Sequence, residues 1–309
     1  MTDRAFNKIA VLGRQGSDNV RATLHRLHHW LFEQGLECKF EASLAPMLND
    51  IGRDSAGPGN DPQPVFADKV QLGRWADLVV VVGGDGTLLA AARDMAQYEK
   101  PVLGINRGRL GFLTDIMPGD LEAQVGAVLA GDYLLEHRFL LQARLERNGE
   151  TVRSATALND VVLHPGEAIR MIEFDLYVDN QFVYRQRSDG LIVSTPTGST
   201  AYALSAGGPI MQPGLDAISL VPMFPHSLSS RPLLVDGNSL IRIELGSDNQ
   251  EPPHLSCDAQ THMPTCPGDR LHICKHEHRL HLLHPRQHNY FEICRTKLGW
   301  GSRLGQDEE

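Results

Sequence analysis

A short apolar run, Leu78 to Val82, ends directly at the glycine-rich segment Gly83-Gly84-Asp85-Gly86-Thr87. A run in which every residue is apolar, bounded by turn residues, is typical of a strand buried on both faces. The residues that follow, Leu88 to Ala92, favour a helix. The pattern therefore predicts a buried strand, a tight turn and a helix, and this order of elements indicates an α/β fold.

Three glycines in this turn, Gly83, Gly84 and Gly86, would let a ligand approach the backbone without meeting a Cβ atom. The helix that follows presents free N–H groups and the positive end of its dipole to an anion. With Asp85 and Thr87 in the same turn, we expect a site for the phosphates of a nucleoside triphosphate and its magnesium. The spacing differs from the Walker loop and from the dinucleotide fingerprint, so a purely structural turn is the alternative interpretation.

The first 133 residues alternate between strand-like and helix-like segments, which predicts a parallel sheet with helices on both faces. Its ligand site is expected at the carboxyl ends of the strands, where Asp85 lies. The segment from Asn49 to Pro64 is rich in Gly, Pro, Asp and Asn and is expected to be a mobile surface loop. The expected strands are Asn7 to Leu12, Leu36 to Phe40, Leu78 to Val82 and Pro101 to Ile105, and the expected helices are Val20 to Leu31, the segment after Thr87, and Leu121 to Ala130.

Beyond residue 133 the pattern changes to many short strand-like runs separated by turns, which predicts a second, mostly β domain. A last segment, Asn289 to Trp300, is expected to form a helix that packs back on the first domain. We therefore expect three parts, comprising residues 1–133, 134–284 and 285–309. The expected strands of the second domain are Leu140 to Arg144, Ala157 to His164, Met171 to Val178, Leu191 to Ser194, Leu240 to Leu245 and Arg270 to Cys274.

A polar segment rich in hydroxyl side chains, Arg187 to Tyr202, is the second candidate site. It contains a strand-like run, Leu191 to Ser194, then a turn with serines and threonines around Gly198, and an expected helix from Thr200. Such a segment can present N–H and hydroxyl groups to ribose or phosphate oxygens. A hydroxyl-rich cap on an ordinary helix is an equally good interpretation of the same residues.

With both segments in one chain, the sequence resembles the bacterial NAD kinase family. The resemblance runs from about residue 8 to residue 301 and rests on motifs that occur in the family's order. Lipid kinases share only the first of these motifs, and 6-phosphofructokinases share little beyond it. The motifs are Gly83 to Thr87, Asn106 to Asp115, Asn159-Asp160, and Arg187 to Ser205.

The resemblance implies that the γ-phosphoryl group of ATP is transferred to the 2′-hydroxyl of the adenosine ribose of NAD, which makes NADP. ATP is then the donor and Mg²⁺ the divalent metal, and Asp85 is the catalytic residue that accepts the hydroxyl proton. Phosphoryl transfer has a loose transition state, so a weakly basic carboxylate suffices. An orienting role or a magnesium contact for Asp85 stays open. The implied fold is an α/β domain with a Rossmann-like parallel sheet, then a mostly-β, sandwich-like domain and a C-terminal helix that returns to the first domain.

The resemblance also implies which residues bind NAD. An adjacent amide and carboxylate, as in Asn159-Asp160, suit an adenine edge and ribose hydroxyls, and arginine suits a pyrophosphate. The residue matching Arg187 is associated with a preference for NAD over NADH and for ATP over polyphosphate. Ion pairs at the surface or between domains are the alternative role for Arg170, Arg187 and Asp189. The implied NAD contacts are Asp85, Gly86, Asn159, Asp160, Arg170, Arg187, Asp189, Thr200, Ala201, Tyr202, Ala203, Leu204, Ser205 and Gln260, and the implied phosphate turn is Gly83, Gly84, Gly86 and Thr87.

The composition of the chain restricts its binding partners and its location in the cell. A net charge of −9 argues against binding to nucleic acid or to an anionic membrane. A polar N-terminus and the lack of a long apolar run favour the cytoplasm. Five cysteines, an odd and scattered number, are expected to be reduced thiols. The family resemblance adds NAD and ATP as small-molecule partners and a homodimer or homotetramer as the assembly.

Two other functions are weighed against an NAD kinase. One is a kinase of another hydroxyl substrate, such as a lipid or a sugar, built on the same glycine-rich turn. The segment from Arg187 to Ser205 argues against it. The other is a catalytically silent NAD-binding regulator, for which the intact Asp85 gives no support.

The stretch from His254 to His288 holds eight of the fourteen histidines. Side chains at alternate positions, from His272 to His278, would share one face of a strand. Histidine and cysteine are zinc ligands, but the spacing fits no standard zinc pattern. We therefore expect a solvated, partly exposed strand with no metal ligands, and a structural or regulatory metal is the alternative.

Overall fold

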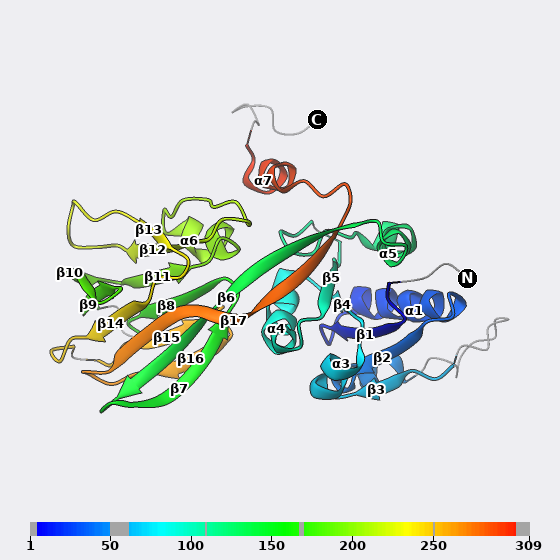
Figure 1. The fold of residues 1–309 in the computed structure, drawn as a ribbon, viewed down its shortest axis with the longest axis horizontal. Helices are drawn as coiled ribbons and strands as arrows, with labels where there is room; N and C mark the ends of the chain where they lie inside the picture. Colours follow the sequence, from blue (N-terminus) through cyan, green and yellow to red (C-terminus); the bar gives the residue numbers. More distant parts are fainter. Residues whose placement is uncertain (1–4, 50–61, 109, 167–169, 250, 301–309) are drawn as a thin grey trace. The chain divides into compact units, whose positions relative to one another are not determined.

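The computed structural model describes residues 5–49, 62–108, 110–166, 170–249 and 251–300. The chain divides into two compact units (Figure 1): unit 1 comprises residues 1–136 and 280–309, and unit 2 comprises residues 137–279. Each unit has its own apolar core. Among the described residues no helix has the length and apolarity needed to cross a membrane. All five cysteines are described and free, as expected.

Unit 1 is built around a parallel sheet with the strand order β17-β5-β4-β1-β2-β3. Every residue of β4 is buried, as predicted from its unbroken apolar run. The strands are β1 (Lys8–Gly13), β2 (Glu37–Glu41), β3 (Val65–Ala67), β4 (Leu78–Val82), β5 (Pro101–Ile105) and the C-terminal part of β17 (Arg270–Pro285).

Helices cover both faces of this sheet, with α1 beside α5 on one face and α3 beside α4 on the other (Figure 1). In α1, Leu24, Leu27 and Leu31 are fully buried because their spacing places them on one side of the helix. Gly35, with φ of 69°, ends this helix, and the Leu36 N–H donates to the carbonyl of Leu31. The helices of unit 1 are α1 (Asp18–Glu33), α2 (Ala45–Leu48), α3 (Lys69–Trp75), α4 (Asp85–Met95), α5 (Leu121–Leu129) and α7 (Tyr290–Leu298).

The predicted strands and helices of unit 1, including the C-terminal helix, are confirmed to within two residues, except that α4 begins three residues earlier than expected. The short elements β3 and α2 and the helix α3 were not predicted. Helix α3 begins with a capping box, a motif that can be recognised in a sequence. The Asp68 side chain accepts the N–H of Gln71 at 2.8 Å, and the Gln71 side chain accepts the N–H of Asp68 at 3.3 Å. Most of the loop expected from Asn49 to Pro64 lies outside the described residues.

Unit 2 consists of two sheets with antiparallel pairing that share one apolar core, which confirms a mostly-β, sandwich-like domain. Leu141 and Phe174 enter this core from one sheet, and Val161, Leu191 and Leu255 enter it from the other. The first sheet contains β6 (Tyr133–Arg147), β7 (Glu150–Ala157), β9 (Ile172–Val178), β10 (Gln181–Ser188), β14 (Ile241–Leu245) and the N-terminal part of β17. The second has the order β13-β12-β11-β8-β15-β16 and contains β8 (Asp160–His164), β11 (Gly190–Ser194), β12 (Ala217–Met223), β13 (Leu233–Asp236), β15 (His254–Cys257) and β16 (Thr261–Pro264).

One prediction for unit 2 was wrong. The single strand expected from Ala157 to His164 is interrupted after Ala157, because the backbone of Leu158 and Asn159 donates to the Asp258 side chain instead of continuing a ladder. The helix expected from Thr200 is confirmed as a short element, in which a 3₁₀ turn (Gly198–Thr200) is followed by the single turn α6 (Tyr202–Ser205). Gly207, with φ of 82°, ends it.

Candidate active site

The glycine-rich turn of unit 1 connects β4 to α4 at the carboxyl end of the sheet. The Gly83 N–H donates to the carbonyl of Ile105 at 2.9 Å, which ties the turn to the neighbouring strand β5. A Cβ atom on Gly83 would lie 2.5 Å from Oγ1 of Thr87. Close packing against Thr87 is therefore the reason that position 83 needs glycine. Gly84 is the N-cap residue, and Asp85 begins the helix.

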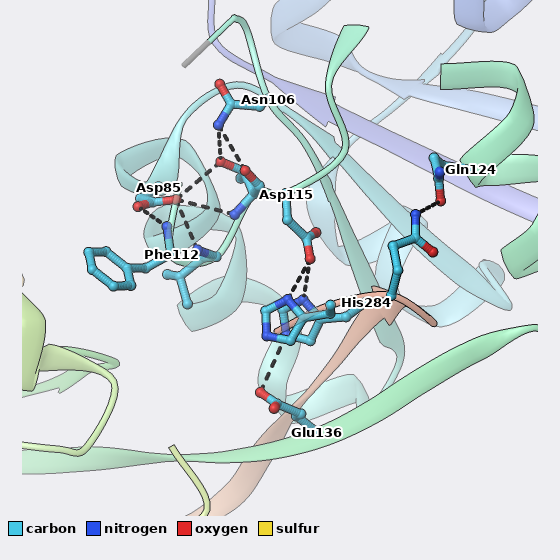
Figure 2. Close-up of polar contacts among 11 residues, drawn as sticks. Asp85, Asn106, Phe112, Asp115, Gln124, Glu136 and His284 are labelled. Atoms are coloured by element: carbon cyan, nitrogen blue, oxygen red, sulfur yellow. Dashed lines mark hydrogen bonds and ion pairs between the residues drawn. The ribbon is translucent and has the colours of Figure 1, made fainter. Parts of the chain in front are cut away.

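Four hydrogen bonds hold the carboxylate of Asp85 (Figure 2). Its Oδ2 accepts the N–H of Phe112 at 2.9 Å. Its Oδ1 accepts the N–H groups of Leu113 and Thr114 at 3.1 and 3.2 Å, and the Thr114 hydroxyl at 3.1 Å. A negatively charged side chain in the first turn of a helix is also favoured by the helix dipole. The carboxylate is therefore held in one orientation before any ligand binds.

The segment that holds Asp85 is itself fixed by the buried side chain of Asn106. Asn106 Nδ2 donates to the carbonyl of Thr114 at 2.8 Å and to its Oγ1 at 2.9 Å. Its Oδ1 accepts the N–H groups of Arg107 and Gly108 at 2.6 and 3.2 Å. The side chain of Asn106 thus connects the backbone of residues 107–108 with that of Thr114, one of the residues that bind Asp85.

A cavity of about 650 Å³ in unit 2 contains many of the residues expected to bind NAD. A cavity of this size fits an ordinary small-molecule ligand. The predicted residues that line it are Asn159, Asp160, Arg170, Asp189, Ala201 and Tyr202. The other lining residues are Val162, His164, Pro165, Gly166, Met223, Phe224, Ser256, Asp258, Ala259 and His262.

Asp160 and Asp258 are two buried carboxyl groups at the wall of this cavity. Asp258 accepts the N–H groups of Leu158, Asn159 and Asp160, at 3.0, 2.8 and 3.2 Å. Burial, and then the negative charge of Asp258, raise the pKa of Asp160 to about 7. A carboxyl group with this pKa is partly protonated at neutral pH, so it can both donate and accept a hydrogen bond towards a ligand hydroxyl.

The hydroxyl groups of the segment around Gly198 bind backbone carbonyls of that segment and of the neighbouring residues Leu158 and Asn159. Thr195 Oγ1 donates to the carbonyl of Leu158 at 2.6 Å, and Ser194 Oγ donates to that of Asn159 at 3.2 Å. Ser199 Oγ donates to the carbonyl of Pro196 at 2.7 Å. These bonds favour the structural interpretation for the hydroxyls, which fix the edge of the cavity and leave its lining to other side chains.

Other predicted residues lie around or outside this cavity. Arg187 lines a neighbouring cavity of about 610 Å³ together with Arg170 and Asp189. Ala203 is fully buried in the apolar cluster beneath α6. Gly86 is exposed in the turn of unit 1. Thr200, Leu204, Ser205 and Gln260 do not line either cavity.

Sequence reasoning missed Asp258 and gave no individual role to the segment that holds Asp85. Asp258 and Ala259 have φ of 52° and 53°, a left-handed conformation that is uncommon for residues other than glycine and often marks a functional site. The Gln260 N–H donates to the carbonyl of Cys257, which closes this turn between β15 and β16. No signal in the sequence indicates either feature, because the partners of Asp258 are about 100 residues away along the chain.

The histidine-rich stretch is a partly exposed strand, as expected: His272, Cys274, His276 and His278 are half-buried on β17. Within the described ranges, the metal-ligand type residues that come close enough to share an ion are Asp115, His284 and His288. None of the four alternating residues belongs to that group.

Comparison with known proteins identifies the family. Residues 9–133 match the ATP-NAD kinase N-terminal domain, and residues 158–284 match the ATP-NAD kinase C-terminal domain. A protein of Hahella chejuensis named NAD kinase is 57% identical over 301 residues, which cover 97% of this chain and 98% of the relative. A Pseudomonas fluorescens protein of the same name is 55% identical over 300 residues, with the same coverage.

Two solved structures are similar in fold. A yeast NADH kinase complexed with NADH has a TM-score of 0.88 and 24% identity, covering 100% of this chain and 94% of the other. An NAD kinase from Archaeoglobus fulgidus in complex with ATP has a TM-score of 0.69 and 26% identity, covering 94% of this chain and 99% of the other. The expected fold class is therefore confirmed.

Proposed function

The chain belongs to the ATP-NAD kinase family, and from this premise we propose that it transfers the γ-phosphoryl group of ATP to the 2′-hydroxyl of the adenosine ribose of NAD. The products are NADP and ADP. Family membership supports an NAD kinase and neither a lipid or sugar kinase nor a silent regulator. The observation that carries the catalytic assignment is the orientation of the Asp85 carboxylate by four hydrogen bonds at the start of α4.

In the proposed reaction the ribose oxygen forms a bond to the γ-phosphorus while the bond from that phosphorus to the ADP oxygen breaks. The hydroxyl proton passes to Oδ2 of Asp85, which accepts one of the four hydrogen bonds and retains a lone pair for the substrate. Because the transition state of phosphoryl transfer is loose, positioning dominates the rate. Because the Asp85 carboxylate is already oriented, it loses little conformational freedom when the substrate binds.

The proposal assigns the dinucleotide to the cavity of unit 2. The partly protonated carboxyl of Asp160 suits ribose hydroxyls, and the exposed ring of Tyr202 suits stacking on a planar base. Arg170 and Arg187 provide the cations for a pyrophosphate. If Arg187 sets the preference for the oxidised dinucleotide, wild-type protein will use NAD more efficiently than NADH. Equal use of the two as acceptors would contradict that role.

Mg²⁺ keeps several waters and binds one or two carboxylates together with substrate phosphates. The turn from Gly83 to Thr87 has the single carboxylate of Asp85, whose oxygens already accept four hydrogen bonds and, in the proposed reaction, the substrate proton. The magnesium ion that the family implies would therefore be held by the ATP phosphates and water, and Asp85 does not fit as its ligand. When bound, the ion would neutralise charge on the ATP phosphates. A cytoplasmic location and a homodimeric or homotetrameric assembly complete the proposal.

The decisive experiment incubates purified protein with ATP, Mg²⁺ and NAD, and detects NADP with an NADP-specific dehydrogenase. We expect NADP from the wild type and a loss of at least about 100-fold in kcat for Asp85→Asn, because removing an oriented catalytic group has effects of this size. Near-normal turnover by folded Asp85→Asn would contradict the assignment. Absence of NADP from folded wild type would contradict the function itself.

Asp77→Asn is the matched control. Asp77 precedes β4, whereas Asp85 follows it, and its Oδ2 accepts the N–H groups of Asn7 and Lys8 at 3.1 and 3.0 Å. The same substitution therefore removes a carboxylate that holds backbone amides, at the opposite end of the same strand. We expect Asp77→Asn to lower the unfolding temperature and to leave kcat unchanged.

A further inference from the structure

Two stacked histidines bind the residue that directly follows the segment holding Asp85. Oδ2 of Asp115 lies 2.9 Å from Nδ1 of His284 and 2.7 Å from Nδ1 of His288 (Figure 2). The two imidazole rings stack with their centroids 3.8 Å apart. The side chains of Asp115, His284 and His288 are 8%, 0% and 4% exposed. Ionisable groups this deeply buried are costly unless they are paired, so their pairing points to a specific role.

The distances in this cluster favour hydrogen bonds over a metal ion. Ligand atoms that coordinate a tetrahedral zinc at about 2.0–2.1 Å lie roughly 3.3 Å from one another. The two distances from Asp115 to His284 and His288, 2.9 and 2.7 Å, are those of N–H groups donating to a carboxylate. Both histidines therefore donate from Nδ1 to the same oxygen of Asp115.

Charge stabilises the cluster. Burial opposes ionisation of Asp115, but the hydrogen bonds from His284 and His288 outweigh it and hold the pKa of Asp115 below its ordinary value. Burial likewise opposes protonation of His284, yet its bond to Asp115 and the nearby carboxylate of Glu136, 3.4 Å from Nε2, hold the pKa of His284 above its ordinary value. Asp115 is thus a carboxylate anion that accepts hydrogen bonds from both His284 and His288.

We propose that Asp115, His284 and His288 form a positioning group for Asp85. The peptide unit between Thr114 and Asp115 connects the two sets of contacts, since Thr114 donates to Asp85 and Asp115 is fixed by the histidines. The inference rests on the proposed function, in which Asp85 accepts the hydroxyl proton. It assigns a role in positioning Asp85 to residues 284–288, which lie near the C-terminal end of the chain.

A second contact connects the same two segments. The ring of Phe112, whose N–H donates to Asp85, packs against the ring of Tyr290 with centroids 6.4 Å apart. Tyr290 is the first residue of α7 and follows His288 by two positions. The segment from the end of β17 to the start of α7, which contains both histidines and Tyr290, therefore contacts the Asp85-binding segment at both Phe112 and Asp115.

Asp115→Asn tests the role of the anion. The amide can replace one acceptor but not the charge, so the segment loses its anchor. We expect kcat to fall between about tenfold and a hundredfold with less than a threefold change in KM for NAD, because small misplacements act on the reacting step. Amide hydrogen exchange in peptides covering residues 111–114 should become about tenfold faster, because local opening exposes these amides.

Asp269→Asn is the control for loss of a buried carboxylate. The Asp269 side chain is 1% exposed and is bound by Arg147 at 2.8 and 2.9 Å and by the Cys266 N–H at 2.7 Å, all within unit 2. We expect this variant to lose stability and to keep the kcat and the exchange rates of residues 111–114 of the wild type. If Asp115→Asn behaves like Asp269→Asn, the cluster is only structural and the proposal is wrong.

Two substitutions at each histidine, to asparagine and to glutamine, distinguish the role of Nδ1 from that of Nε2. An asparagine amide can reproduce the Nδ1 donor, whereas a glutamine amide reproduces the Nε2 position. His284→Asn and His288→Asn should therefore retain about tenfold more kcat than His284→Gln and His288→Gln at similar unfolding temperatures. The opposite order would overturn the proposal, as would a zinc ion bound by the wild type and lost in Asp115→Asn.

Failure of this inference can be told from failure of the proposed function. Hydrogen exchange in residues 111–114 needs no turnover, so it tests the anchor even if the wild type makes no NADP. Faster exchange in Asp115→Asn supports the positioning group, and unchanged exchange with unchanged kcat overturns it.

Discussion

Gly111 packs directly against the carboxylate of Asp85. A Cβ atom at Gly111 would lie 2.2 Å from Oδ1 of Asp85 and 2.6 Å from Oγ1 of Thr114. These two atoms are hydrogen-bonded to each other at 3.1 Å, so neither can move without breaking the bond. The orientation of the proposed catalytic group therefore depends on the absence of a side chain at position 111.

Gly111→Ala should consequently lower kcat by about 100-fold or more, since displacement of a reacting group by about 1 Å has effects of this size. Steady-state kinetics of NADP formation measures this. Gly119→Ala is the matched control, because a Cβ atom at Gly119 would meet nothing within 4 Å. Full turnover by Gly111→Ala would show that the segment tolerates displacement and that the orientation of Asp85 is not limiting.

A similar close approach occurs in unit 2. A Cβ atom at Gly198 would lie 2.2 Å from the carbonyl oxygen of Asn159, which also accepts the N–H of Thr195. Gly198→Ala should displace the backbone of Asn159 and Asp160 at the cavity wall. We expect KM for NAD to rise about tenfold or more, because binding contacts are lost in the ground state as well as the transition state.

Gly214→Ala controls for this substitution, because a Cβ atom at Gly214 would meet no atom within 4 Å. A titration of NAD binding measures the same change without turnover. Unchanged affinity in Gly198→Ala would exclude the Asn159-Asp160 wall from dinucleotide binding.

Local pattern predicted the elements of unit 1 because each is encoded within a few residues. The apolar residues of β4 and the leucine spacing of α1 need no distant partner to be interpreted. Asp85 itself was identified from its turn, but its four hydrogen bonds come from residues 27 to 29 positions further along the chain. Only the fold brings that segment back to α4.

Long-range contacts also decide the parts of unit 2 that the sequence did not predict. The interruption after Ala157 depends on Asp258, about 100 residues away, whose left-handed backbone has no glycine to mark it. The hydroxyls near Gly198 could be ligand contacts or caps by composition, and only their bonds to the backbone of Leu158 and Asn159 favour the latter.

The start of α3 gives a prediction confined to stability. Asp68→Ala removes the side chain that accepts the Gln71 N–H, which should destabilise the protein by about 1 kcal/mol. Urea unfolding measures this, and kcat should not change. Asp68→Asn is the control, because asparagine is an equally good N-cap residue. A loss of stability in Asp68→Asn as large as in Asp68→Ala would mean that charge rather than capping is responsible.

The raised pKa of Asp160 predicts how stability depends on pH. The ordinary pKa of this carboxyl is 3.8, and in the folded protein it is about 7. The folded state therefore holds the proton more tightly, and the associated stability is present below pH 3.8 and is lost as pH rises towards 7. Asp160→Asn cannot ionise and does not suffer this loss. Relative to wild type, the variant should gain on the order of 4 kcal/mol from below pH 3.8 to pH 8, of which about 2.5 kcal/mol falls between pH 5 and pH 8.

Urea unfolding of both proteins at pH 5 and pH 8 tests this prediction, with Asp175→Asn as the control. Its hydrogen bond with Arg185 lowers the pKa of Asp175, so that carboxyl is already ionised at pH 5 and its contribution is constant up to pH 8. The stability difference between wild type and Asp175→Asn should therefore not change over this interval, whereas that of Asp160→Asn should. A difference for Asp160→Asn that is independent of pH would mean that Asp160 is ionised throughout and cannot donate a hydrogen bond to a ribose hydroxyl.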